Sequence, residues 1–137
     1  MAALNETRNA VHNISGGVTS QGLLLQTGAS GLIVCADVTH QPCGVSAAES
    51  SRDAAGALEG AGGTVAVYPM SGIVYVKCEA IAAADADFGI PLYNGATDGH
   101  VSSSSSGSAK QLGVLFMHGE AIAAGDLVPM ACIGVGV

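Results

Sequence analysis

The sequence predicts an all-β protein, a small β-barrel or β-sandwich built from repeated short hairpin units, with an extended N-terminal arm. Two observations lead to this fold class. Short apolar runs rich in valine, leucine and isoleucine recur along the chain, and turn-forming glycine, serine and aspartate residues separate them. No stretch places large apolar residues at helical spacing over three turns.

The apolar runs predict nine strands in chain order. They cover residues 22–27, 31–38, 41–48, 64–70, 72–79, 90–94, 100–103, 111–118 and 126–135. Between the first two strands, Gly28–Gly31 supplies the backbone freedom of a tight reversal. Asp98-Gly99 is a turn signal before the strand at 100–103. The short Met70-Ser71-Gly72 connection predicts a hairpin-like reversal between the strands at 64–70 and 72–79.

The remaining segments define the expected domain organisation. Residues 1–20 are polar without a sustained period, and we expect an extended arm that orders only against a partner. Residues 21–137 are expected to form a single β domain. Within it, a Gly/Ala-rich insert lies near 49–63, where glycines limit any helix to one turn around Ser51–Ala57. A Ser-rich loop occupies residues 102–108.

One pentapeptide, Glu-Ala-Ile-Ala-Ala, occurs twice, at Glu79–Ala83 and at Glu120–Ala124. It is too short for an independent helix, so we expect each copy to be a connector that carries one buried isoleucine. More widely, GIPLYNGATDGHV…KQLGVLFMHGEAIAAGD is similar to the earlier GLIVCADVTHQPCGVSAAESSRDAAG. A unit of this kind cannot bury its apolar face alone, so two units are expected to pack together. The alternative is chance repetition in an alanine-rich chain.

The charge of the chain limits its partners. Eleven acidic and four scattered basic residues give a net charge of −7, which disfavours nucleic acid and acidic membrane surfaces as partners. Charged residues make up only 11% of the chain, whereas ordinary soluble domains contain roughly 25%. Such a surface suits burial against other subunits. The alternative is a secreted or extremophile domain whose surface carries few charges without serving as an interface.

The N-terminal residues lack a basic region followed by an apolar run, so no secretory signal is expected. No apolar stretch approaches the roughly 20 residues that cross a bilayer, so we expect a soluble product made in the cytosol. The cysteines show no C-x-x-C spacing and are expected to be free thiols that behave as small buried hydrophobes. They are Cys35, Cys43, Cys78 and Cys132.

Known catalytic patterns are missing, so we expect neither an enzyme nor a cofactor. The sequence contains no nucleophile elbow and no phosphate-binding glycine loop. Asp37, His40 and Cys43 are spaced three apart, but the strand character of this region keeps them from converging on a metal. Asp85 and Asp87 fit a solvated acidic turn better than a cation site.

The order of several short pieces resembles the tailed-phage head decoration proteins, also called capsid cement or capsid-fibre-like proteins. The pieces are Gly-Val with an Ala-rich connector, VAVY, SGIVYV, AIAA, GIPLY, DGHV, LGV and EAIAAGDLV. The resemblance covers roughly residues 17 to 137 and depends on the order of the pieces. The insert at 49–63 and the serine loop at 102–108 depart from the commonest short members.

The resemblance implies a virion structural protein that binds the outer surface of an icosahedral capsid, assembled in the host cytoplasm. The implied partners are the major capsid protein and further copies of the chain in a homotrimer. Such proteins often reach neighbours with an N-terminal arm. The expected polar contacts with the capsid are therefore Asn5, Arg8, Asn9 and His12. The family has no catalytic residues to carry over.

Three other functions stay open. The main alternative is a free-standing β-barrel that binds a ligand or glycan, although three Tyr, two Phe and no Trp equip the chain poorly for an aromatic pocket. A second is a small enzyme that uses His40 and Cys43. A third is a structural subunit of another protein shell or fibre, which shares every feature except the phage assignment.

Overall fold

The all-β fold class is confirmed by a computed structural model, which describes residues 10–36, 38–105, 109–117 and 119–133. These ranges contain ten strands and no helix, hence no helix that could span a membrane. The strands are β1 (Ala10–Asn13), β2 (Leu24–Thr27), β3 (Leu32–Val34), β4 (Gly44–Ser46), β5 (Thr64–Pro69), β6 (Ile73–Lys77), β7 (Pro91–Asn94), β8 (Val101–Ser102), β9 (Gln111–Leu115) and β10 (Leu127–Cys132).

Each of the nine predicted strands contains one observed strand, whereas β1 lies in the predicted arm. The arm prediction is therefore wrong for residues 10–20. β1 pairs with β5, and the side chains of Ile14 and Val18 behind it are fully buried. Burying these two side chains fixes the segment on the domain without any partner. The rest of the predicted arm, residues 1–9, lies outside the described residues.

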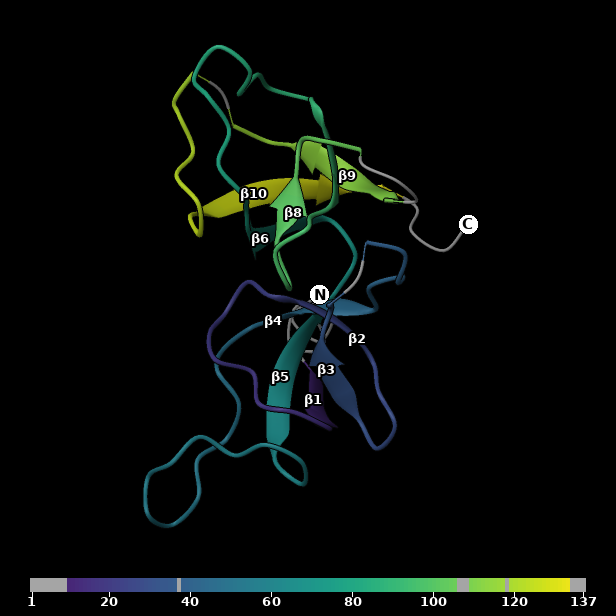
Figure 1. Cartoon of the computed structure of the whole chain (residues 1–137), viewed down its shortest axis with the longest axis vertical. Coiled ribbons are helices and arrows are strands. Elements are labelled where there is room, and N and C mark those ends of the chain that lie inside the picture. The colour runs from purple at the N-terminus through teal and green to yellow at the C-terminus, as the bar shows by residue number, and fades with distance from the viewer. Residues whose placement is uncertain (1–9, 37, 106–108, 118, 134–137) are drawn as a thin grey trace, which may run out of the picture.

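The strands form two five-stranded antiparallel sheets, one from each half of the chain, which lie below and above in Figure 1. The first sheet has the order β1-β5-β4-β2-β3 and the second β6-β10-β9-β7-β8. Each sheet curls until its two edges meet at a single bridge, between Ile14 and Leu32 and between Cys78 and Val101. The sheets are not closed into barrels, and their packing is that of a sandwich.

The predicted hairpin at Met70-Ser71-Gly72 is wrong, because β5 and β6 belong to different sheets. The connection instead carries the chain from the first unit to the second. The apolar residues on the two sides of it serve different cores: Val67 lies in the first and Val74 in the second. The hairpin predicted at Gly28–Gly31 is confirmed, since β2 and β3 pair and the Gly28 N–H donates to Gly31 O at 2.7 Å.

The two sheets are two copies of one folding unit. Adding five to every strand number of the first sheet reproduces the order of the second. The registers also agree. Leu24 is opposite Val45 in the first sheet, and Pro91 is opposite Val114 at the same position of the second. We call two residues that occupy the same register position in the two sheets twins.

Backbone hydrogen bonds outside the strands repeat as well. The Gly22 N–H donates to Ser46 O at 2.8 Å, and its twin Gly89 donates to Leu115 O at 2.8 Å. The predicted repeated unit is therefore present. The predicted alignment is correct for the two Gly-Val pairs, which are twins in β4 and β9. It is shifted for the preceding strand, because the twin of residues 89–94 is 22–27 and not the segment after Gly31.

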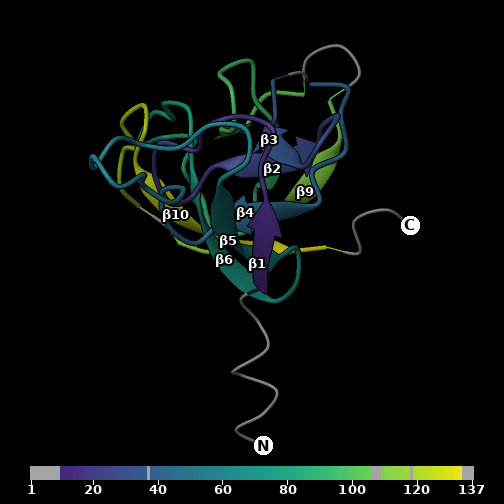
Figure 2. The same cartoon turned by 90° about the horizontal axis from the view of Figure 1, so that it is seen from below.

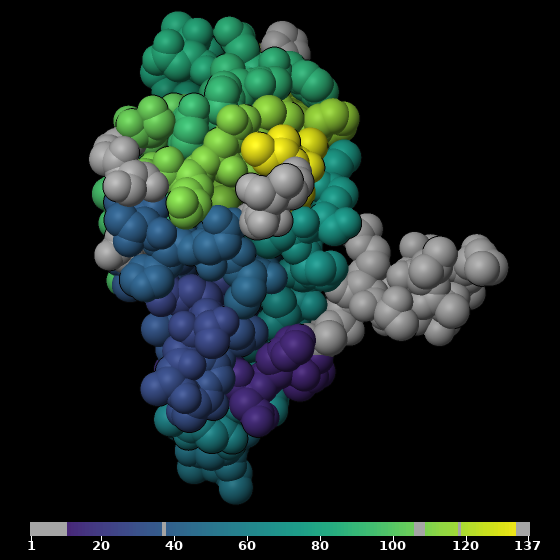
Figure 3. Space-filling view, turned by 90° about the vertical axis from the view of Figure 1, so that its right-hand side faces the viewer, coloured from purple at the N-terminus to yellow at the C-terminus, as the bar shows by residue number. Residues whose placement is uncertain are grey.

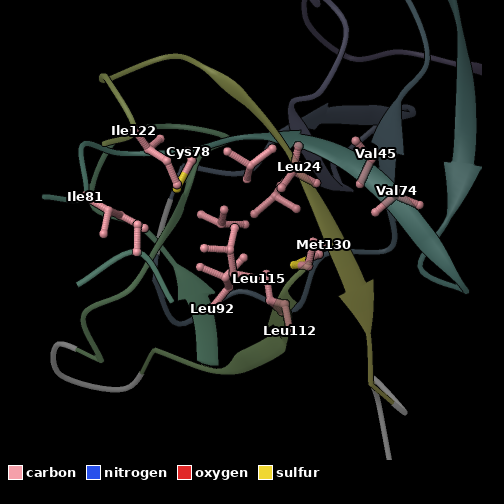
Figure 4. Packing of buried hydrophobic residues seen from close by; sticks show 14 of the residues in the cluster. Leu24, Val45, Val74, Cys78, Ile81, Leu92, Leu112, Leu115, Ile122 and Met130 are labelled. Carbon is pink, nitrogen blue, oxygen red and sulfur yellow. The ribbon is translucent and has the colours of Figure 1, made fainter. Parts of the chain in front are cut away.

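The sandwich has two apolar cores. The smaller core fills the curl of the first sheet and contains Ile14, Val18, Leu23, Leu25, Val65 and Val67. The larger core fills the curl of the second sheet and also takes in Leu24, Cys35 and Val45 from the first unit. Leu24 and Val45 face away from the first core, so the outer face of the first sheet covers the open side of the second core (Figure 4).

The two pentapeptides meet each other inside the second unit. Ile81 and Ile122 form an antiparallel bridge in which each N–H donates to the other carbonyl at 2.9 Å. Their side chains are 3% and 4% exposed and lie at the same end of the larger core (Figure 4). The predicted buried isoleucine in each connector is confirmed. The repetition closes this end of the second core with two equivalent connectors.

The Gly/Ala-rich insert forms a loop between β4 and β5 without the single helical turn that its sequence allowed. A bridge between Arg52 and Leu58 closes it, and Asp53 Oδ1 accepts the N–H groups of Ala55 and Ala57 at 2.9 Å each. These bonds replace the backbone bonds of a helix. The loop extends away from the sheets at the bottom of Figure 1.

The four cysteines are free thiols, as predicted. Only Cys35 and Cys78 are buried, whereas Cys132 is half-buried and Cys43 is exposed. Burial raises the pKa of Cys78 to about 12, and the nearby negative charge of Glu79 adds to the effect. Cys78 therefore stays a neutral thiol at neutral pH and packs as an apolar side chain.

Candidate interaction surfaces

The residue types that bind metals do not gather in the described part of the chain. Among these residues, no group of three His, Cys, Asp or Glu side chains could hold a metal ion. Asp37 lies outside the described residues, and the nearby His40 and Cys43 are both exposed. Asp85 and Asp87 are exposed in the loop before β7.

The first surface is the outer edge of β1. The Ile14 N–H donates to Gly63 O at 3.1 Å, and bonding alternates along an antiparallel pair. The N–H and C=O of Val11 consequently point away from β5, and no hydrogen bond among the described residues uses them. The Val11 side chain is 68% exposed. Figures 2 and 3 show β1 at the outside of the first sheet. An edge strand of this kind can accept another strand.

Of the predicted contact residues, only His12 falls in the described chain. It lies in the middle of β1, opposite Val65, and its side chain is exposed. Asn5, Arg8 and Asn9 lie outside the described residues. The structure thus places one of the four residues next to the unpaired edge.

Charge is nearly absent from the sheets. Lys77 is the one charged residue in the ten strands. In the described chain the loops carry the other charges, including the Glu49–Arg52 ion pair in the insert, with a distance of 2.8 Å between Oε1 and Nε. A sheet face without charges avoids the cost of desolvating them on contact, so it can be buried against another protein more easily than the loops.

The second surface is the outer face of the second sheet. We define it by six outward-facing residues: Ile73, Tyr75, Val114, Phe116, Leu127 and Pro129. Tyr75 is opposite Pro129, and the Phe116 N–H donates to Pro129 O at 2.9 Å, so one apolar row crosses β6, β10 and the end of β9. Phe88 extends this row, with its ring centre 4.6 Å from that of Phe116.

The short apolar periodicity of residues 111–118 and 126–135 predicts strands that are buried in a barrel or sandwich rather than half-exposed, but it does not single out the residues of this surface. A sequence feature that indicates this surface is present in β6, where apolar side chains occupy both faces of the strand. Strands that read as continuous apolar runs are normally covered on both faces. In the described chain only the inner face of β6 is covered: Val74 and Val76 are buried, whereas Ile73 and Tyr75 are 44% and 60% exposed.

Glu79 fixes the turn between β7 and β8. Its carboxylate accepts the Thr97 N–H at 2.7 Å, whereas the first unit fixes its corresponding turn with Ser15, whose Oγ accepts the Ser30 N–H at 2.8 Å. Partial burial raises the pKa of Glu79, but hydrogen bonds from the loop backbone and from Ser102 outweigh it and hold this pKa below its ordinary value. The folded state therefore binds the carboxylate form more favourably than the unfolded chain does.

The lowered pKa predicts a pH dependence of stability. The contribution of Glu79 is fully present above its unfolded pKa of about 4.3 and is lost as the pH falls through the lower folded value. We expect Glu79→Gln to lower the free energy of unfolding by about 1 kcal/mol at pH 7, because the group is partly exposed, and by less at pH 3. Urea unfolding at both pH values measures this. The matched control is Glu120→Gln, because Glu120 is the corresponding residue of the other pentapeptide and is exposed. An equal loss of stability in both variants would contradict the role of Glu79 in holding the turn between β7 and β8.

The fold and its surfaces define a class of protein: a tandem of two all-β units whose sheet faces carry almost no charge. No protein-family model matches the chain, and no curated protein matches its sequence.

Proposed function

We propose that this protein is a structural component of a virion. It decorates the outside of an icosahedral phage capsid and stabilises the expanded shell. The observation that carries the proposal is the edge of β1, which is uncharged, unpaired within the described chain and directly preceded by residues 1–9. A strand of the major capsid protein can add to this edge through backbone hydrogen bonds. The resemblance noted in the sequence supports the same assignment.

The physical chemistry of the chain suits such a role. A protein that binds only the expanded lattice stabilises that state in proportion to its bound concentration. Individually weak contacts become strong when several copies bind one lattice, because each contact raises the effective concentration of the next. The net charge of −7 favours an outward position, since DNA inside the shell would repel the protein.

The arm is proposed to supply polar contacts around this edge. His12 is exposed on β1, and Asn5, Arg8 and Asn9 precede it in the chain. Arg8 is one of only four basic residues, so it can pair with an acidic group of the capsid where most of this chain would be repelled.

Co-sedimentation with expanded, undecorated heads tests the function. We expect the full chain to bind saturably at a fixed ratio to the major capsid protein. A chain that stays in the supernatant at every concentration would refute the proposal. The proposed alternative, binding of a ligand or glycan, would then lead. Its support is the aromatic pair Phe88–Phe116, which is 58% and 43% exposed.

Deleting residues 1–9 is expected to weaken shell binding roughly tenfold or more, because it removes the arm and leaves every described strand in place. Its unfolding midpoint in urea should stay at the value of the full chain. The matched control is deletion of residues 1–16, which removes β1 and the buried Ile14 and should destabilise the fold itself. Unchanged binding by the shorter deletion would exclude the arm as a contact.

A further inference from the structure

The repeated unit buries one particular face in its first copy and exposes it in its second. In the first sheet, the facing pair Leu24 and Val45 lies on the outer side and is 1% and 0% exposed. The twin pair in the second sheet is Pro91 and Val114. Pro91 is exposed and Val114 is half-exposed. Beside them lies the apolar row of Tyr75, Pro129 and Phe116, in which Tyr75 and Phe116 are exposed and Pro129 is half-buried.

A second β-sheet of this same chain covers the face in the first unit. Leu24 and Val45 are buried in the larger core together with Val74 and Val76 of β6. One unit cannot cover both outer faces, so the outer face of the second sheet stays bare in a single chain. An exposed apolar face of this kind marks a site of association.

Charge also favours a second copy of the chain as the partner. Two molecules with a net charge of −7 repel each other most where their acidic loops face each other. The six residues that define this face include no acidic residue. Basic Lys77 lies at its border opposite Leu127, which Asp126 precedes, and Asp87 precedes Phe88. No ion pair in the described chain holds Lys77. A copy that faces this surface can therefore bring opposite charges together at the border.

We infer that a second copy of this chain packs face to face on the outer face of the second sheet, so that the protein is a dimer in solution. A surface that pairs with itself closes a two-fold dimer. The trimer that the sequence resemblance implies would need a different contact. The inference concerns the free protein and does not depend on a shell, so its failure would leave the proposed function open.

Sedimentation of the purified full chain over a range of concentrations tests the inference. We expect a reversible dimer, and we expect Tyr75→Lys to raise its dissociation constant roughly thirtyfold, because a charge replaces an aromatic side chain at the interface. Ile73→Lys, on the same strand and face, should act in the same direction. The matched control is Val11→Lys, which replaces an exposed apolar side chain on β1 of the first sheet and should leave the dimer unchanged.

All three variants change exposed side chains, so their urea midpoints should equal that of the parent chain, and this comparison separates lost association from lost folding. A monomer at every concentration, or a trimer, would overturn the inference. Equal weakening by Val11→Lys and Tyr75→Lys would also overturn it, because the effect would then come from added charge and not from this face.

Discussion

Gly113→Ala is expected to lower the free energy of unfolding by about 3 kcal/mol, at the upper end of what overpacking costs. Gly113 lies in β9 at a close approach to β10, opposite Cys132. An added Cβ would lie 2.3 Å from the Ala131 carbonyl oxygen and 2.7 Å from Met130 Cγ. The carbonyl oxygen belongs to the paired backbone, so it cannot move without opening the β9–β10 pair. Urea unfolding of the variant and the parent measures the difference.

Two other glycines provide the controls: Gly44, the twin of Gly113, and Gly60, which has open space around it. An added Cβ at Gly44, the twin of Gly113, would lie 2.4 Å from Val67 Cγ1 and 2.9 Å from Tyr68 O, so Gly44→Ala should destabilise in the same direction. At Gly60, which lies in the insert, the nearest atom would be 3.9 Å away. Gly60→Ala should therefore stay within about 0.5 kcal/mol of the parent. Equal stability of Gly113→Ala and Gly60→Ala would show that the β9–β10 register is wrong.

Local chemistry explains why the strands could be predicted from the sequence. Residues in β5 and β6 are β-branched or aromatic at most positions, and such side chains favour a pleated surface in any sheet. The turn at Gly28–Gly31 was predictable for the same reason, because glycine allows a tight reversal whatever the strands around it do. These properties act within a few residues, and a single sequence displays them directly.

The division of the strands into two sheets could not be predicted in this way. β5 and β6 are adjacent in sequence and both apolar, which normally indicates a hairpin. They separate because Val67 and Val74 are buried in different cores, and that choice depends on strands far away in the chain. β1 was missed because its four residues include His12 and Asn13 and show no strand pattern. Its pairing with β5 and the burial of Ile14 compensate for this weak local preference.

The sequence could predict that the protein has uncharged surfaces for association, but not which residues form them. The low charge content of the chain is enough to indicate association with other subunits. Which apolar residues face outward depends on the curl of each sheet and on which outer face the other unit covers. Val45 and Val114 follow equivalent glycines, Gly44 and Gly113, yet only Val45 is fully buried. The difference arises from the packing of one unit on the other.

The second large effect on the free energy of unfolding is expected at the two connectors, Glu79–Ala83 and Glu120–Ala124, which pair through Ile81 and Ile122. Ile81→Ala and Ile122→Ala are each expected to lower the free energy of unfolding by about 3 kcal/mol, because each removes a buried side chain from the larger core. The double variant should lose less than the sum, by about 1 kcal/mol, since the two residues face each other across one bridge. The coupling is obtained from urea unfolding of the four proteins in this cycle.

Leu25→Ala provides the comparison, because Leu25 is fully buried but lies in the smaller core of the first unit. Its effect and that of Ile122→Ala should add, since residues in separate cores share no packing partners. If the two isoleucines were also additive, they would stabilise the fold independently, and the repeated pentapeptide would be two unrelated connectors. If coupling is found only between Ile81 and Ile122, the repeated pentapeptide stabilises the fold through the pairing of its two copies. Each copy would then provide the surface that the other needs to close this end of the second core.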